Sequence, residues 1–287
     1  MSRKRSQNYW ILTLLLAAII LCALLAGCQT QNKLLQPYLL LYAFDAEGQL
    51  LKAQMTIADS SRILGRWVYH GGLSGKDVVL AESGIGMTNA AMTTQAMLDR
   101  YHPKAVIFSG IAGGIDSSVY IGDITVCRTW HQHDYGYYGK DGFQVSGIGV
   151  YDPGTDSIGR TSEYTVDSAL FAAAEKMASG DVELAKIGDR TPRLIVGGAG
   201  VTGNTFIDSR EKRIWLSETF HALVTDMESS AVAHVCIVND VPYIIFRSAS
   251  DLAGGSGSET ADAELEQFFT IAADNSSRVV MRFLNGL

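Results

Sequence analysis

Three acidic residues follow apolar runs of the chain, at positions where their carboxyl groups could carry out chemistry. With the runs that precede them, they are Glu47 after 37–42, Glu228 after 223–227 and Asp251 after 243–246. Such runs predict strands, and open α/β sheets bind their ligands beyond the carboxyl ends of strands. A buried carboxyl group can keep its proton and act as an acid, whereas an ionised one can act as a base or bind hydroxyl groups. The three side chains are therefore candidates for acid–base chemistry and for binding hydroxyl groups.

Each of these acids also has a simpler structural interpretation. Asp251 could cap the next helix, and Glu228 could be an acid that a helix dipole favours in the first turn. Glu47 could be a solvated acid in a surface turn, and the nearby Asp45 competes with it as a base. The residue types by themselves leave these alternatives open.

The elements that must position these acids alternate along the chain. Apolar β-like runs predict strands at 37–42, 77–81, 105–108, 122–128, 193–197, 223–227 and 243–247. Helical spacing of apolar residues predicts helices at 89–101, 229–238 and 262–284. Strands separated by helices predict an α/β fold, a three-layer α/β/α sandwich with a central mixed, mostly parallel and partly barrel-like sheet. The stretch 130–161 is rich in Gly, Tyr and Asp with little periodicity, which predicts a long loop region.

The N-terminal segment has the layout of a secretory signal. Basic residues at positions 3–5 precede the apolar run 10–26, which ends at Cys28 in a Leu-Ala-Gly-Cys sequence. That sequence resembles the bacterial lipobox, whose cysteine carries lipid. The sequence therefore predicts a signal peptide at 1–27, an anchor and linker at 28–37, and one α/β domain at 38–287. About 17 apolar residues can also just span a bilayer, so an uncleaved transmembrane anchor is the alternative.

Both forms of anchor place the domain outside the cytoplasm, in the cell envelope. Gln29 after the cysteine favours the periplasmic face of the outer membrane in a Gram-negative host. The chain has 23 basic and 30 acidic residues, and loss of the signal segment would remove three basic ones. This acidic balance argues against nucleic acid as a partner, because binding to phosphate needs a basic surface. Cys127 and Cys236 lie in apolar patterns and are predicted to be buried thiols rather than a disulfide.

Five short segments support a family resemblance that covers nearly all of residues 38–285. They are Ala-Phe-Asp-Ala-Glu at 43–47, Glu-Ser-Gly-Ile-Gly-Met at 82–87, Ser-Gly-Ile-Ala-Gly-Gly at 109–114, Val-Thr-Gly-Asn-Thr-Phe-Ile at 201–207 with Asp-Met-Glu at 226–228, and Arg-Ser-Ala-Ser-Asp at 247–251. In this order and spacing the chain resembles the nucleoside phosphorylase superfamily. Within it, the chain is most similar to the 5′-methylthioadenosine/S-adenosylhomocysteine nucleosidases. The resemblance implies hydrolysis of the bond between a purine base and its ribose.

The resemblance also implies a role for each carboxyl group. Asp251 would protonate N7 of the purine, which makes the base a better leaving group. Glu47 would deprotonate the attacking water. Glu228 would hold the 2′- and 3′-hydroxyls of the ribose, with Met227 packed under the sugar.

Other residues of these segments are expected to bind the base or to support the acids. Phe206 and Ile207 are expected to stack on the purine and line its pocket, with ordinary core packing as the alternative. Gly113 would let the backbone approach the base or sugar closely. Ser250, which precedes the catalytic aspartate in its Ser-Asp pair, is expected to bind the substrate. Arg247 is expected to brace a neighbouring carboxylate.

Two positions in the glycine loop favour water over phosphate as the nucleophile. The related phosphorylases hold phosphate with an Arg and a Ser, where this chain has Phe108 and Ile111. An apolar pocket offers no compensation for the lost solvation of a phosphate dianion. The chain also departs from the family pattern at 43–48, where a run of glutamates after Ala-Met is usual, and at Asn204, where Asp is usual.

The sequence thus predicts a purine nucleosidase that needs no cofactor and no metal and that forms a homo-oligomer, most simply a dimer. A purine nucleoside phosphorylase of the same fold is one alternative. A non-catalytic nucleoside-binding or storage lipoprotein is the other. The G-x-G-x-x-G stretch at 198–203 comes too late in the chain for a dinucleotide fold, and His131 and His133 lack a third metal ligand.

Overall fold

The computed structural model describes residues 36–180, 182–255, 257 and 260–287, so the predicted signal segment and Cys28 lie outside the described residues. Within this part, twelve strands form one mixed sheet, and two further pairs of strands form separate hairpins. The strands of the main path are, in spatial order, β12 (Glu163–Thr165), β7 (Thr129–Gln132), β14 (Ala199–Thr202), β15 (Ala222–Asp226), β5 (Ala105–Gly114), β1 (Tyr38–Tyr42), β4 (Lys76–Glu82), β3 (Arg66–Leu73) and β2 (Thr56–Ile63).

The sheet branches at β5, because this long strand has more than two neighbours. Its first part pairs in parallel with β1, and β16 (Tyr243–Asp251) pairs with it in parallel from Val106 to Gly113. Its last residues pair antiparallel with β15. From β16 the branch continues through β6 (Ile124–Val126) to β13 (Leu194–Val196). The carboxyl ends of β1, β5 and β16 therefore meet the end of β15 in one place.

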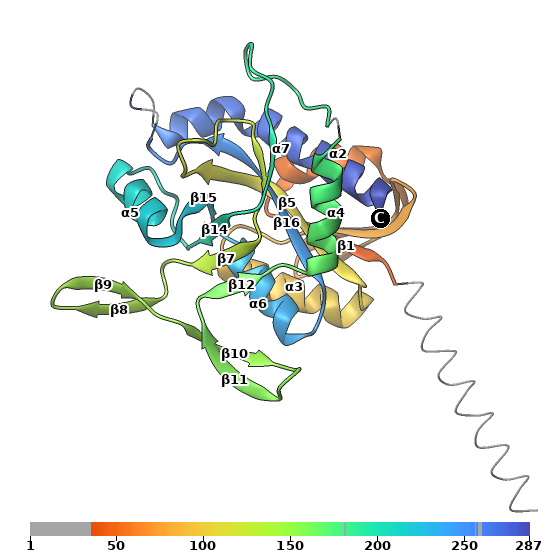
Figure 1. The fold of residues 1–287 in the computed structure, drawn as a ribbon. Helices are drawn as coiled ribbons and strands as arrows, with labels where there is room; N and C mark the ends of the chain where they lie inside the picture. Colours follow the sequence, from red (N-terminus) through yellow and green to blue (C-terminus); the bar gives the residue numbers. More distant parts are fainter. Residues whose placement is uncertain (1–35, 181, 256, 258–259) are drawn as a thin grey trace, which may run out of the picture. The chain divides into compact units, whose positions relative to one another are not determined.

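Helices cover both faces of the sheet, as Figure 1 shows. On one side lie α2 (Asp45–Gln54), α4 (Ser168–Ala178) and α7 (Ala261–Gly286), and on the other lie α3 (Met87–Tyr101) and α6 (Ser229–Val238), while α5 (Arg210–Phe220) packs beside β14 and β15. Alternate residues of β1 enter different cores, because successive side chains of a strand point to opposite faces. Leu39 and Leu41 join the α3/α6 core, whereas Leu40 and Tyr42 join the α2/α7 core. The predicted three-layer α/β fold is confirmed.

The stretch 130–161 is not the loop region that its composition predicted. It contains β7 and two antiparallel hairpins, β8 (Gly136–Gly139) with β9 (Gly142–Val145) and β10 (Ile148–Asp152) with β11 (Ser157–Thr161). Figure 1 shows both hairpins extending away from the sheet. Most of their side chains are exposed, so neither face needs the apolar alternation by which a strand is recognised.

Further differences concern elements that the sequence did not predict. The polar strand β2 lies exposed at the sheet edge, and its pairing with β3 was missed for the same reason as the hairpins.

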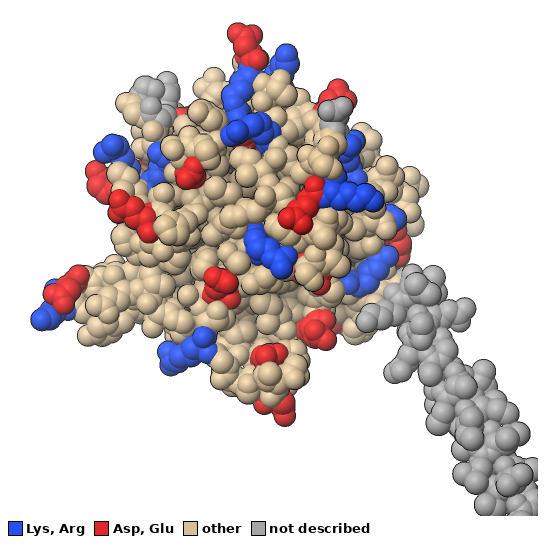
Figure 2. Space-filling model, viewed as in Figure 1, with Lys and Arg blue, Asp and Glu red and all other residues tan. Residues whose placement is uncertain are grey.

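Cys127 and Cys236 are buried free thiols, as predicted. In the described part of the chain, no helix combines the length and the apolar character needed to cross a membrane. On the face seen in Figure 2, acidic and basic side chains are interspersed, without a basic patch.

Candidate active site

One cavity of about 290 Å³ lies where the carboxyl ends of β1, β5, β15 and β16 meet. Its size is near the lower end of the roughly 300–1,000 Å³ found for small-molecule pockets. The structure brings all eight predicted site residues of the domain to this cavity. They are Glu47, Gly113, Phe206, Ile207, Met227, Glu228, Ser250 and Asp251.

Asp251 is the last residue of β16 and is buried at the cavity wall. Its Oδ1 accepts a hydrogen bond of 2.9 Å from the backbone N–H of Ala253, and its Oδ2 accepts one of 2.9 Å from the hydroxyl of Ser250. Burial raises the pKa of Asp251 to about 6. The helix-capping interpretation is wrong, because Thr260 caps α7. Asp251 therefore presents a buried carboxyl group that can keep a proton near neutral pH.

A glycine opposite this carboxyl group makes the approach possible. A Cβ atom on Gly113 would lie 2.9 Å from Oδ1 of Asp251 and 3.3 Å from a methyl carbon of Thr225. Any larger residue at position 113 would push the carboxyl group away. The close backbone approach expected at Gly113 is thus to the acid itself.

Glu47 lies in the first turn of α2 and is buried, so the surface-turn interpretation is wrong. Its Oε2 accepts a 2.6 Å hydrogen bond from the N–H of Ala43 just before the helix, and its Oε1 accepts one of 2.8 Å from the N–H of Ile111 on β5. Burial raises the pKa of Glu47, while Arg247 and these N–H groups oppose the rise. Gly48 completes the arrangement, because a Cβ there would lie 2.5 Å from the ring of Tyr42. The unusual glycine thus lets α2 lie against β1.

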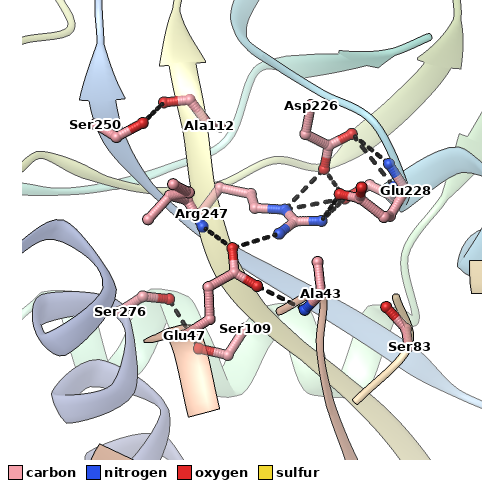
Figure 3. Close-up of polar contacts among 12 residues, drawn as sticks. Ala43, Glu47, Ser83, Ser109, Ala112, Asp226, Glu228, Arg247, Ser250 and Ser276 are labelled. Carbon is pink, nitrogen blue, oxygen red and sulfur yellow. Dashed lines mark hydrogen bonds and ion pairs between the residues drawn. The ribbon is translucent and has the colours of Figure 1, made fainter. Parts of the chain in front are cut away.

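Arg247 on β16 is fully buried and connects three carboxylates. Its Nε lies 2.7 Å from Asp226, its Nη2 3.4 Å from Glu228 and its Nη1 3.8 Å from Glu47. Figure 3 shows the guanidinium group between Glu47 on one side and the other two acids on the other. Nη1 has no hydrogen-bond partner among the described residues. The bracing expected of Arg247 is present, and it extends to all three acids.

Glu228 precedes α6 and projects into the cavity, where Met227 also lines the wall. Its Oε1 accepts a 2.8 Å hydrogen bond from the N–H of Gly86. Burial raises the pKa of Glu228 to about 7, with Asp226 and Glu47 adding to the rise and Arg247 opposing it. Its side chain makes no capping bond to α6, so its orientation comes from Gly86 and Arg247.

Asp226 was predicted only as part of a motif, and its role emerges from the structure. It accepts a 2.6 Å hydrogen bond from Thr202 and others from Ser229, and it is the acid nearest to Arg247. The G-x-G-x-x-G stretch before it contains β14 rather than a turn that opens a helix. The dinucleotide-binding alternative is therefore wrong.

The apolar part of the cavity comes from several elements. Phe206 is 46% exposed and lines the cavity, whereas Ile207 is buried and also packs in a small core beside α5. Phe44, Ile85 and Leu265 complete the apolar lining but were not predicted, since their sequence patterns also fit core residues. Phe108 lies in the core with its ring centre 4.1 Å from the guanidinium carbon of Arg247, and Ile111 lines the cavity.

The histidines of the sequence 131–133 do not form a metal centre. His131 lies 3.7 Å from Glu163, and the ring of His133 is buried with burial lowering its pKa to about 4. Across the described residues, no three His, Cys, Asp or Glu side chains are grouped to hold a metal ion.

A family model described as the phosphorylase superfamily matches residues 39–285, and the chain belongs to this superfamily. Among curated proteins, it is similar to the 5′-methylthioadenosine/S-adenosylhomocysteine nucleosidase of Psychromonas ingrahamii, with 32% identity over 248 residues. That match covers 85% of this chain and 96% of the relative. The enzyme of the same name from Bacillus thuringiensis is 30% identical over 248 residues, and that match also covers 85% of this chain and 96% of the relative.

Two solved structures of nucleosidases with this name are also similar. The enzyme of Neisseria meningitidis, in complex with methylthio-immucillin-A, has a TM-score of 0.72 and 26% identity, and the match covers 88% of this chain and 100% of that one. The enzyme of Colwellia psychrerythraea, in complex with adenine, has a TM-score of 0.72 and 28% identity, with 88% and 96% covered. The predicted family and fold class are confirmed.

Proposed function

We propose that this chain hydrolyses the N-glycosidic bond of purine nucleosides of the adenosine type and releases the free base. The observation that carries the proposal is the pair of buried carboxyl groups, Asp251 and Glu47, that line one cavity together with Glu228. The curated relatives are nucleosidases, and the two solved structures hold methylthio-immucillin-A and adenine. Hydrolysis of this bond requires an acid for the base, a nucleophilic water and stabilisation of the ribose.

In this reaction Asp251 is the general acid that protonates N7 of the purine. Its pKa of about 6 keeps a useful fraction protonated at neutral pH, which an ordinary aspartate would not. The hydrogen bonds from Ser250 and Ala253 orient its carboxyl group. Ser250 is thus a positioning residue for the acid.

Glu47 is the base that deprotonates the attacking water. Arg247 supports this role, because its buried guanidinium group lies close to the carboxylate, with Nη1 3.8 Å from Oε1 of Glu47. The charge of Arg247 also favours the ionised form of Glu47, which is the form that accepts a proton. Glu47 thus provides the proton acceptor for the water.

Glu228 binds the 2′- and 3′-hydroxyls of the ribose, with Met227 under the sugar. As the base leaves, positive charge develops on the ribose ring, and a nearby carboxylate stabilises it. Arg247 and the N–H of Gly86 hold Glu228 in one orientation, so little reorganisation is needed during the reaction.

The apolar residues that line the cavity form two groups, one for the purine base and one for the 5′ substituent of the nucleoside. Phe206 and Ile207 enclose the purine, and Gly113 lies against its edge. Phe44, Ile85 and Leu265 supply a further apolar lining that suits a 5′-alkylthio group better than a hydroxyl group. This lining favours thioether nucleosides, such as 5′-methylthioadenosine, over adenosine.

The hydrolase proposal can be tested by identifying the sugar product and by comparing the rates with and without phosphate. Because Phe108 and Ile111 provide neither charge nor hydroxyl for a phosphate ion, we expect free 5′-modified ribose as the sugar product, at a rate that phosphate does not change. The measurement is a chromatographic assay of residues 29–287 with methylthioadenosine, adenosine and inosine, with and without phosphate.

Each alternative function gives a different result in this assay. A ribose 1-phosphate product formed only with phosphate would identify a phosphorylase. Tight binding of the nucleosides without release of base would identify the binding or storage lipoprotein. A reaction without the protein serves as the control for spontaneous hydrolysis.

We further propose that Cys28 carries a lipid that anchors the domain at the periplasmic face of the cell envelope. The apolar run 10–26 and the Leu-Ala-Gly-Cys sequence support this localisation. In cells fed a radioactive fatty acid, we expect label in the wild-type protein and none in Cys28→Ala, which should remain as a precursor or be released. Cys127→Ala is the matched control and should be labelled like the wild type. Equal labelling of Cys28→Ala and wild type would contradict the anchor.

The partners of the domain are then the nucleoside, the membrane through Cys28, and a second copy of the chain. We propose a homodimer, as the family resemblance implies. Ile85 and Phe206 line the cavity and are 53% and 46% exposed, so a second subunit could cover them. Nucleic acid is not expected to bind, because the chain is acidic.

A further inference from the structure

The turn that follows Asp251 is held from a separate element, the first turn of α7. The N–H of Leu252 donates a 2.8 Å hydrogen bond to Oε2 of Glu264. Within the turn, Ala253 donates to Asp251 and has a left-handed φ of 51°. Glu264 is only 5% exposed, so its carboxylate has lost most of its water and depends on such contacts.

The charges around Asp251 come from two further elements besides its own strand. Glu264 on α7 and Asp208 just before α5 are the acids that act on Asp251, and both raise its pKa in addition to the effect of burial. Arg213 on α5 interacts with Glu264 and donates a hydrogen bond of 3.2 Å to the carbonyl of Gly114. Asp208 is itself occupied, because it accepts a 3.0 Å hydrogen bond from the N–H of Ala261. Of these two acids, Glu264 is therefore the one that both accepts a hydrogen bond from the turn after Asp251 and acts through its charge on the carboxyl group of Asp251.

We propose that Glu264 is a positioning residue for Asp251, which fixes the turn that orients the carboxyl group and keeps negative charge beside it. The inference rests on the acid role proposed above for Asp251. Like charge nearby disfavours ionisation, so Glu264 helps Asp251 to retain the proton that it must donate. The hydrogen bond to Leu252 keeps this proton directed at the same point of the cavity.

The substitution Glu264→Gln separates the two effects. Its amide oxygen can still accept from Leu252, but the negative charge is gone. Since the acid must be protonated, activity falls on the basic side of the profile of kcat/KM against pH. We expect that limb to move to lower pH by less than about one unit, because burial is the main cause of the raised pKa of Asp251, with the plateau retained.

Glu264→Asp tests the contact with the turn. It keeps the charge but shortens the side chain, so the carboxylate withdraws from Leu252. We expect a lower plateau of kcat/KM and a basic limb close to that of the wild type. Glu266→Gln, an exposed charge change on the same helix, is the matched control and should leave both unchanged.

The outcomes distinguish this inference from the proposed function. A profile for Glu264→Gln that overlays the wild type would overturn the charge effect, and an unchanged plateau for Glu264→Asp would overturn the positioning effect. If Glu264→Gln does not fold, the plateau of Glu264→Asp still decides whether Glu264 positions the turn. Full turnover by Asp251→Asn would instead show that Asp251 is not the acid, which is a failure of the proposed function.

Discussion

Asp251→Asn is expected to lower kcat by ~10²–10⁴-fold, the usual contribution of general acid catalysis. The amide keeps the size of the side chain and can still hydrogen-bond to the purine, but it has no proton to transfer. Binding should change much less, because the interactions with the neutral purine largely survive. The measurement combines steady-state kinetics of base release with direct titration of a nucleoside.

The matched control for this substitution is Asp262→Asn, an exposed aspartate in the first turn of α7. Its kinetics should equal those of the wild type. Glu228→Gln provides a contrast, since loss of its carboxylate should weaken ribose binding as well as turnover. Unchanged turnover in Asp251→Asn would exclude Asp251 as the acid.

Arg247→Met is expected to lower the free energy of unfolding by about 3–5 kcal/mol at neutral pH, the usual cost of removing one partner of a buried ion pair. The guanidinium group is the shared cation of Asp226, Glu228 and Glu47, and all three are buried. Methionine fills a similar volume but leaves these carboxylates without compensation. Denaturant unfolding at fixed pH gives the difference, and the exposed Arg100→Met is the matched control.

The loss of stability in Arg247→Met should grow as the pH rises. Burial already raises the pKa of Glu228 to about 7, and loss of the cation raises it further. The native state then holds protons that the unfolded chain, with ordinary carboxyl groups, has released, so stability decreases with increasing pH. We expect a smaller loss at pH 5 than at pH 8, and an equal loss at both would contradict the ion-pair explanation.

Much of the sheet was predictable because its buried strands are continuous apolar runs. The runs 105–108 and 243–246 correctly indicated β5 and β16, and the helix predicted at 229–238 has the bounds of α6. Both strands nevertheless continue to Gly114 and Asp251, through residues with little β-like character. Pairing of the two strands with each other stabilises these extensions, and the runs do not encode this pairing.

Several of the elements that were missed lack a buried face. The strands of the hairpins at 136–161 and the edge strand β2 are mostly exposed. Their backbone hydrogen bonds hold them together, and such bonds leave no apolar pattern in the sequence. Helix α2 was missed because it is short, includes Gly48, and packs through only a few buried side chains.

The sequence by itself determined which residues are available for chemistry and in which family's order they occur. It identified the three carboxyl groups, the glycine opposite the acid and the apolar positions in the phosphate loop. Tertiary structure alone decided their protonation and orientation. Arg247 lies 200 positions after Glu47 in the chain, yet both are buried side by side, and Glu264 contacts the turn after Asp251 from another element. The physical reason is that a pKa depends on burial and on charges a few ångströms away, and folding brings those charges from distant parts of the chain.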